Sequence, residues 1–129
     1  MIVDTSALVA IVVREPGHEA LLEVLTQPDA TAAAGAPTVA ELGLVLSARL
    51  GTDARSLVAG LLDHLGIATV PFSDAHWRAA VEAFWRYGRG RHRAGLDLGD
   101  CLTYAVASLA GEPLLFVGDG FTRTDLVPA

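Results

Sequence analysis

The chain alternates short apolar segments of strand character with longer segments in which apolar residues recur at helical spacing. Strands are predicted at residues 2–3, 32–34, 67–70 and 114–117, with a short last strand at 124–127. Helices are predicted at residues 7–13, 18–25, 37–50, 53–65, 74–85 and 97–109. Strands separated by helices pair in parallel, and the helices cover both faces of the sheet. The pattern therefore predicts an α/β fold, a three-layer α/β/α sandwich around a central, mainly parallel sheet of four to five strands.

Length and composition limit the possibilities further. The 129 residues have room for one domain with one core, without an internal repeat or linker. No apolar run approaches the roughly 20 residues of a membrane-spanning helix, and no basic segment precedes the first strand, so we expect neither a membrane segment nor a signal peptide. The single cysteine, Cys101, excludes an internal disulfide and fits a reducing cytoplasm.

The apolar content is high for a chain without a membrane segment. The hydrophobic fraction is 52% and the mean hydropathy is +0.44. This surplus favours a protein partner, either a second copy or a different chain, although a core rich in alanine and leucine is an alternative. In the helix predicted at 74–85, the large apolar residues fall at helical spacing and are predicted to form the inner face; these are Trp77, Val81, Phe84 and Trp85. For the three aromatic residues, packing in a dimer is the alternative to packing in the core.

The charges are unevenly distributed. The net charge of −6 argues against general nucleic-acid binding, yet four of the nine arginines crowd residues 86–93 together with His92. Within that stretch, Arg89, Arg91 and Arg93 are candidates for contact with an RNA backbone, because guanidinium groups bind phosphates through paired hydrogen bonds. A solvated loop with local ion pairs explains the same residues equally well.

Four acidic residues lie where a predicted strand gives way to a helix or loop: Asp4, Glu41, Asp100 and Asp119. The chain has no lysine to neutralise them. Because the carboxyl ends of parallel strands meet at one edge of a sheet, we expect the four carboxylates to face one shallow pocket. Carboxylates gathered without cations share protons or hold a metal ion, and hard oxygen ligands select Mg²⁺ or Mn²⁺.

Three of the four acids, taken singly, also have a structural explanation, whereas Asp119 after a buried strand has no obvious capping role. Thr38-x-x-Glu41 matches a capping box, and Asp97 and Asp100 lie in a first helical turn, where the helix dipole favours acidic groups. Asp4 fits an ordinary helix N-cap. Spacing alone therefore leaves a metal site and a set of helix caps as competing interpretations.

Four segments carry a resemblance to a known family: IVDTSA at 2–7, TVAEL at 38–42, LDLGDCLTYA at 96–105 and LFVGDGF at 115–121. The chain resembles the PIN-domain family, and more narrowly the VapC-type toxins of bacterial toxin–antitoxin pairs, from Met1 to nearly the last residue. The resemblance implies one PIN-like domain over residues 1–129, an endoribonuclease dependent on Mg²⁺ or Mn²⁺. It further implies inhibition by a VapB-type antitoxin, a homodimer, and family acids at Asp4, Glu41, Asp100 and Asp119.

The sequence departs from that family at two positions. Asp97 stands where the family usually has asparagine, which adds a negative charge to the site. Gly120 stands where the family often has a second acid, so Asp119 has no acidic neighbour.

The mechanism expected from these residues is hydrolysis of a phosphodiester by a metal-activated water. Asp4, Glu41 and Asp100 would be the main ligands, while Asp119 would complete the site or orient the nucleophile. Thr5, Ser6 and Asp97 are candidates for a supporting layer around them, although Thr5 and Ser6 also fit plain helix capping.

Two other functions remain open. One is an inert PIN-like interaction module, in which the acids only cap helices. The other is a phosphotransfer protein of the haloacid-dehalogenase or receiver type, which would need a lysine that this chain lacks.

Overall fold

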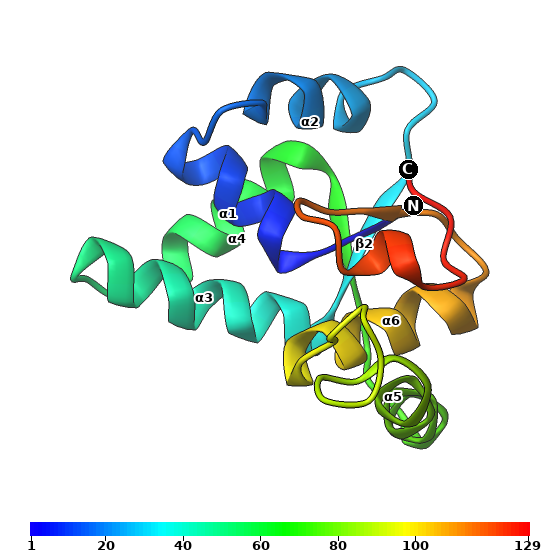
Figure 1. The fold of residues 1–129 in the computed structure, drawn as a ribbon. Helices are drawn as coiled ribbons and strands as arrows, with labels where there is room; N and C mark the ends of the chain where they lie inside the picture. Colours follow the sequence, from blue (N-terminus) through cyan, green and yellow to red (C-terminus); the bar gives the residue numbers. More distant parts are fainter.

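Four parallel strands form the centre of the molecule. The computed structural model describes residues 1–129, with β1 at Ile2–Val3, β2 at Ala32–Gly35, β3 at Ile67–Val70 and β4 at Leu114–Leu115. The strand order is β3-β2-β1-β4, and every pairing is parallel. The chain therefore leaves the central β1 toward β2 and β3 on one side and returns to β4 on its other side (Figure 1). The prediction of a parallel α/β sheet is confirmed.

Helices cover both faces of this sheet. The buried residues of α5 (Asp74–Tyr87) and α6 (Leu98–Ala110) form one core cluster that includes Ile2 of β1. A second cluster includes Val3 of β1 and buried residues of the remaining helices, α1 (Thr5–Val13), α2 (His18–Leu25), α3 (Ala36–Leu50) and α4 (Arg55–Leu65). Successive residues of a strand point to opposite faces, so the two clusters lie on opposite sides of the sheet. The three-layer sandwich is confirmed.

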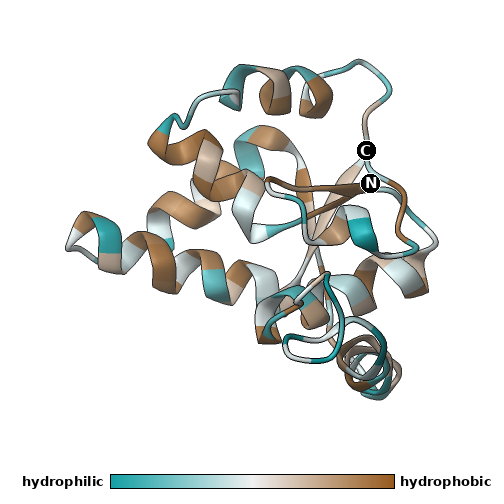
Figure 2. Cartoon of the chain, viewed as in Figure 1, coloured by the Kyte–Doolittle hydropathy of each residue, from teal (hydrophilic) through white to brown (hydrophobic).

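The first helix of the second layer is apolar almost throughout, as Figure 2 shows for α1. Its residues from Ala7 to Ile11 are all buried, because α1 is enclosed by α2 and α3 in addition to the sheet. None of the six α-helices combines the length and the hydrophobicity that a membrane span requires.

The C-terminal segment differs from the prediction. The strand predicted at 114–117 ends at Leu115, since Phe116 turns its ring onto Phe121, with 5.3 Å between the ring centroids, and Gly118 adopts a positive φ of 105°. No strand forms at 124–127: a 3-10 helix, η1 (Phe121–Arg123), precedes this segment, and an isolated bridge joins Leu114 to Pro128 just after it. Proline has no N–H to donate, so it cannot extend a strand ladder.

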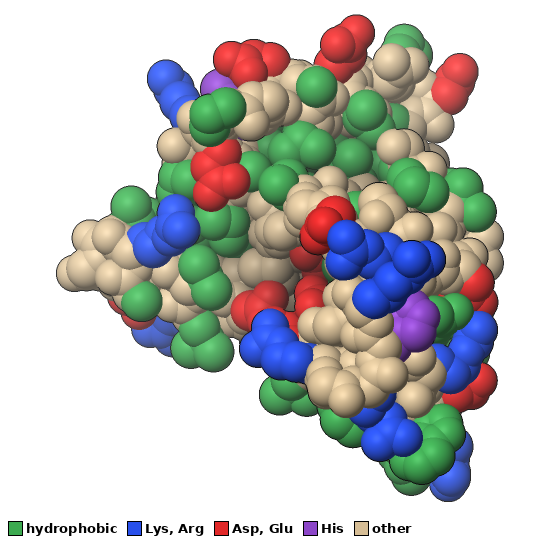
Figure 3. Space-filling model, in the orientation of Figure 1, with side chains coloured by type: hydrophobic (Ala, Val, Ile, Leu, Met, Phe, Trp, Pro, Cys, Tyr) green, Lys and Arg blue, Asp and Glu red, His purple; other side chains and the backbone are tan.

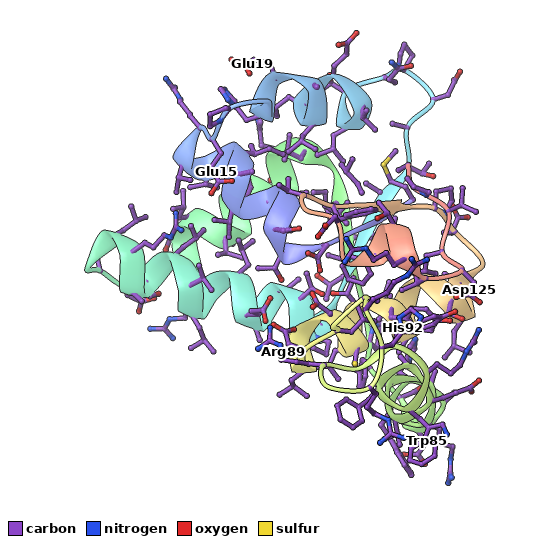
Figure 4. The ribbon with its side chains drawn as sticks, in the orientation of Figure 1. Glu15, Glu19, Trp85, Arg89, His92 and Asp125 are labelled. Carbon is purple, nitrogen blue, oxygen red and sulfur yellow. The ribbon has the colours of Figure 1, made fainter.

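The predicted inner face of α5 was wrong. The buried residues of this helix are Ala80, Ala83 and Tyr87, and α5 packs most closely against α6. Small alanine side chains allow that close approach, which a row of aromatic side chains would prevent. The large apolar residues instead face outward: Trp77, Val81, Phe84 and Trp85. Figure 4 shows Trp85 pointing away from the body of the protein.

Candidate active site

Asp4 lies directly after β1, at the point where the strand order reverses. In open parallel sheets this position forms a crevice at the carboxyl ends of the strands. Asp4 is only 5% exposed and is the N-cap of α1, with Oδ2 accepting hydrogen bonds from Ser6 N at 3.0 Å and Ser6 Oγ at 2.6 Å. Its Oδ1 accepts a hydrogen bond from Thr103 Oγ1 of α6 at 2.8 Å. A buried carboxylate is thus held by neutral donors and forms no ion pair.

Asp100 and Asp97 lie at the start of α6, and they hold each other in a reciprocal capping box. Asp100 N donates to Asp97 Oδ1 at 2.9 Å, and Asp97 N donates to Asp100 Oδ2 at 3.1 Å. Burial raises the pKa of the Asp100 carboxyl to about 6, opposed by the backbone hydrogen bond from Asp97. The negative charges of Asp97 and Asp4 raise this pKa further. The mutual repulsion shows that the fold brings Asp4 and Asp100 into one electrostatic environment.

Glu41 approaches the same end of α6 from the neighbouring helix α3. A Cβ atom added to Gly99 would overlap Glu41 Oε2 and would lie 3.2 Å from Glu41 Cδ. Glu41 and Asp97 line a hollow of about 460 Å³ together with Thr38, Gly99 and Leu98, among others. Figure 3 shows acidic side chains gathered around a hollow in the middle of this face. A side chain at position 99 would therefore displace the Glu41 carboxylate from its place beside the α6 N-terminus.

Asp119, the fourth predicted acid, lies at the surface and pairs with an arginine. It lies in the loop after β4 with 79% of its side chain exposed, and its Oδ2 accepts a hydrogen bond from Arg123 Nη2 at 3.1 Å. The structure gives it no hydrogen bond to Asp4, Asp100 or Glu41. The structure therefore brings Asp4 near Asp100 and Glu41 against Gly99 of α6, while Asp119 forms an ion pair on the surface. That all four carboxylates face one pocket stays a prediction.

The predicted supporting residues behave differently from one another. Ser6 links two elements, because its Oγ donates to Asp4 and accepts from Val117 N at 3.0 Å. Asp97 orients Asp100, as described above. Thr5 makes no such contact, since its buried hydroxyl has no hydrogen-bond partner.

Two supporting residues were missed by the sequence reasoning. Thr103 donates to Asp4, and Thr38 Oγ1 lies 3.1 Å from Thr103 Oγ1. Thr38 is not part of a capping box, since α3 begins at Ala36 with Gly35 as its N-cap. The available signal was spacing: each threonine lies one helical turn from a candidate acid, Thr38 before Glu41 and Thr103 after Asp100.

The donor set fits a hard divalent cation, although the side chains do not form a closed cage. No group of three or more His, Cys, Asp or Glu side chains is already arranged to hold a metal ion. The groups that do converge offer only carboxylate oxygens, which suit Mg²⁺ or Mn²⁺ better than zinc. The repulsion between Asp100 and its acidic neighbours is uncompensated by any arginine, and a bound dication would relieve it.

The arginines of residues 86–93 divide into two groups. Arg86 is held within the protein by Tyr87 and Asp125, and Arg91 stacks on Trp85 with 3.7 Å between its guanidinium carbon and the ring centroid. Arg89 forms no ion pair and lines a groove with Asp97 at the start of α6, where Figure 4 also shows it. The Arg93 side chain likewise forms no ion pair. Arg89 is therefore the loop arginine placed beside the acidic residues.

The parallel four-stranded sheet, with acidic residues at its carboxyl edge, makes this chain an α/β protein with a candidate metal site at that edge. Residues 1–126 match the family model of the PIN domain. The chain therefore belongs to the PIN-domain family, as the four sequence segments suggested.

Its curated relatives within that family are VapC ribonucleases. The chain is 47% identical over 126 residues to ribonuclease VapC36 of Mycobacterium tuberculosis, covering 98% of this chain and 91% of the relative. It is 45% identical over 130 residues to ribonuclease VapC42 of the same species, covering 100% of this chain and 98% of the relative. The VapC ribonuclease of Mycolicibacterium smegmatis is 40% identical over 126 residues, covering 98% of this chain and 97% of the relative.

Solved structures share the fold at lower sequence identity. VapC20 of Mycobacterium tuberculosis, described as a sarcin-ricin loop cleaving toxin, aligns with a TM-score of 0.80 at 16% identity, covering 99% of this chain and 97% of that one. A toxin–antitoxin complex from Klebsiella pneumoniae aligns with a TM-score of 0.71 at 19% identity, covering 99% and 95%. These structures support the α/β/α sandwich described above.

Proposed function

We propose that this chain is the endoribonuclease toxin of a toxin–antitoxin pair and cleaves RNA with Mg²⁺ or Mn²⁺ held by Asp4, Glu41 and Asp100. The observation that carries the proposal is the buried, unpaired Asp4 carboxylate beside Asp100, whose pKa burial and acidic neighbours raise to about 6. Such an arrangement costs stability in the absence of a ligand, and perturbed carboxyl groups of this kind mark functional sites. The relationship to VapC ribonucleases supports RNA as the substrate.

The chain's own residues would orient the site. Ser6 and Thr103 fix the two oxygens of Asp4, and Asp97 fixes Asp100 at the start of α6. When bound, the metal ion would supply electrostatic stabilisation of the phosphate and a water of lowered pKa as nucleophile. Asp119 is proposed as the fourth acid, and its exposed ion pair with Arg123 would have to open first. Opening costs little, since exposed ion pairs contribute about 0–1 kcal/mol.

Arginines beside the hollow would hold the RNA backbone. Arg89 lies next to Asp97, and neither of them forms an ion pair within the chain, so the Arg89 guanidinium is available to a phosphate. Arg91 and Arg93 would add contacts farther along the loop, where Arg91 and Trp85 present a stacked pair to solvent. Figure 3 shows arginine side chains on both sides of the acidic hollow.

A second copy of the chain would cover the outward face of α5 and the start of α6. This face has a groove of about 480 Å³ lined by Trp77, Phe84 and Leu102, with Leu98 76% exposed and Val81 60% exposed beside it. The exposed apolar surface supports a homodimer.

The antitoxin would bind elsewhere, on the layer formed by α1 to α4. A groove of about 550 Å³ runs between α3 and α4 and is lined by Val39, Leu44, Val58 and Leu62, among others. A helix of a VapB-type antitoxin, with apolar residues on one face, fits a groove of this kind.

RNA cleavage by the purified toxin tests the proposed function. Cleavage should stop in EDTA, return with Mg²⁺ or Mn²⁺, and be abolished in Asp4→Asn and Asp100→Asn. Asp29→Asn is the matched control, because Asp29 is exposed in a turn and makes no side-chain contact. Full activity in excess chelator would refute the metal mechanism. Wild-type protein that binds antitoxin but neither metal nor RNA would favour the inert interaction module, whose acids only cap helices.

A further inference from the structure

Two buried threonines join the three elements that carry the candidate metal ligands. Thr103 Oγ1 on α6 donates to Asp4 Oδ1 at 2.8 Å, and Thr38 Oγ1 on α3 lies 3.1 Å from Thr103 Oγ1. Thr38 is 4% exposed and Thr103 is 2% exposed, so water does not compete for either hydroxyl. Neither residue caps its helix, because Gly35 and Asp97 hold the N-cap positions. Helix termination therefore does not explain these hydroxyl groups.

The direction of donation follows from the acceptor at the end of this chain of hydroxyls. An ionised carboxylate only accepts hydrogen bonds, so Thr103 must use its single hydroxyl proton on Asp4. The contact between the two threonines then requires Thr38 to be the donor. Donation thus runs from Thr38 to Thr103 to Asp4, and the first hydrogen bond strengthens the second by polarising it.

The donors around Asp4 are neutral, and this matters for a metal ligand. Hydrogen bonds from Ser6 and Thr103 fix the orientation of both carboxylate oxygens while leaving the full negative charge. An arginine in the same place would orient the carboxylate but cancel the charge that attracts a cation. Each oxygen of a carboxylate has two lone pairs, so Asp4 Oδ1 keeps one acceptor site after receiving the Thr103 proton.

We propose that Thr38 and Thr103 form a positioning relay that orients Asp4 for a divalent cation and fixes α3 and α6 relative to β1. The inference rests on the proposed metal-dependent function. Because Thr38 lies one turn before Glu41 and Thr103 one turn after Asp100, the relay sets the spacing of all three acids. Thr103 and Thr38 act through Asp4 and are positioning residues. Outer hydrogen-bond partners of metal ligands typically contribute 10–100-fold to metal affinity.

The direct test is Mn²⁺ affinity of the purified protein, measured by electron paramagnetic resonance in the absence of RNA. Thr103→Val keeps the side-chain shape but removes the hydroxyl, and it should weaken Mn²⁺ binding by roughly 10–100-fold. Thr103→Ser should restore wild-type affinity. Thr38→Val should cause a smaller loss of Mn²⁺ affinity than Thr103→Val. The double variant should bind Mn²⁺ as weakly as Thr103→Val alone. Thr69→Val, at an exposed position of β3 without a side-chain hydrogen bond, is the matched control.

The outcomes separate the relay from the proposed function. Wild-type Mn²⁺ affinity in Thr103→Val would overturn the relay, whereas RNA cleavage in excess chelator by a wild-type chain that binds no Mn²⁺ would overturn the proposed function. Near-ultraviolet circular dichroism checks that each variant is folded. If Thr103→Val does not fold, Thr38→Val and Thr103→Ser decide: the first must weaken Mn²⁺ binding and the second must not, and any other pattern contradicts the relay.

Discussion

Gly99→Ala should move the Glu41 carboxylate without lowering the stability of the fold, so it tests the role of Glu41 independently of stability. Gly99 lies in the first turn of α6 without a positive φ, so alanine fits the backbone and should raise helix stability by up to about 1 kcal/mol. The added Cβ would overlap Glu41 Oε2, come within 3.2 Å of Cδ and within 3.3 Å of Oε1. Ordinary contacts begin near 3.4 Å, so the carboxylate must move away from the α6 N-terminus.

We expect RNA cleavage to fall by about 10²-fold in Gly99→Ala, because a displacement of roughly 1 Å in a catalytic group has that effect. The free energy of unfolding should be unchanged or higher. The assay compares cleavage rates of one labelled RNA with urea unfolding of the same preparations. Gly60→Ala in α4 is the control, since a Cβ there meets nothing within 4 Å. Wild-type cleavage by Gly99→Ala, or activity lost only in step with stability, would refute the assigned role of Glu41.

Three further predictions concern charge and surface. The pKa of Asp100 is raised from 3.8 to about 6 in the fold. Ionisation of Asp100 therefore leaves the free energy of unfolding unchanged below pH 3.8 and lowers it by the full amount above pH 6. Allowing for partial exposure, metal-free Asp100→Asn should gain about 1–2 kcal/mol of unfolding free energy at pH ~7.5 and nothing at pH ~3.5; equal gains at both would contradict the burial argument. Arg89→Glu should weaken RNA binding and lower its salt slope by about 1, whereas Arg49→Glu, exposed in the last turn of α3 and without an ion pair, should not. Unchanged RNA binding in Arg89→Glu would favour the alternative, a solvated loop that does not contact RNA. The homodimer proposed to form through the α5 face should be lost in Val81→Arg, leaving a monomer in light scattering, and a persistent dimer would exclude the α5 face as the interface.

The architecture could be predicted because local sequence and topology agree. Ile2 and Val3 form a short apolar strand that ends at Asp4, and the acid that follows a central parallel strand must lie at the carboxyl edge. Asp97 and Asp100 were placed at the start of a helix by their spacing alone, and the structure has that helix. Such features depend on residues close together in the chain.

The errors arise where the outcome depends on distant contacts. Apolar residues lie on more than one side of α5, so periodicity alone could not tell that Ala80 and Ala83 pack on α6 while Trp77 and Phe84 face outward. The exposed position of Asp119 follows from the turn at Gly118, whose conformation no periodic pattern encodes.

The threonine contacts were invisible for the same reason. Thr38 and Thr103 are 65 residues apart, and Thr103 and Asp4 are 99 residues apart. Only the packing of α3 and α6 against β1 brings the three side chains together. Once a fold is known, a buried hydroxyl one helical turn from a candidate acid therefore helps to identify residues that orient that acid.

Anomalous diffraction from crystals grown with Mn²⁺ locates the bound ion without reference to activity, and so tests whether the three acids hold a metal. We expect one or two Mn²⁺ peaks within coordination distance of Asp4 and Asp100 carboxylate oxygens, with Glu41 bound directly or through water. Occupied crystals with Mn²⁺ only at other sites, and Asp4 and Asp100 without the ion, would contradict it.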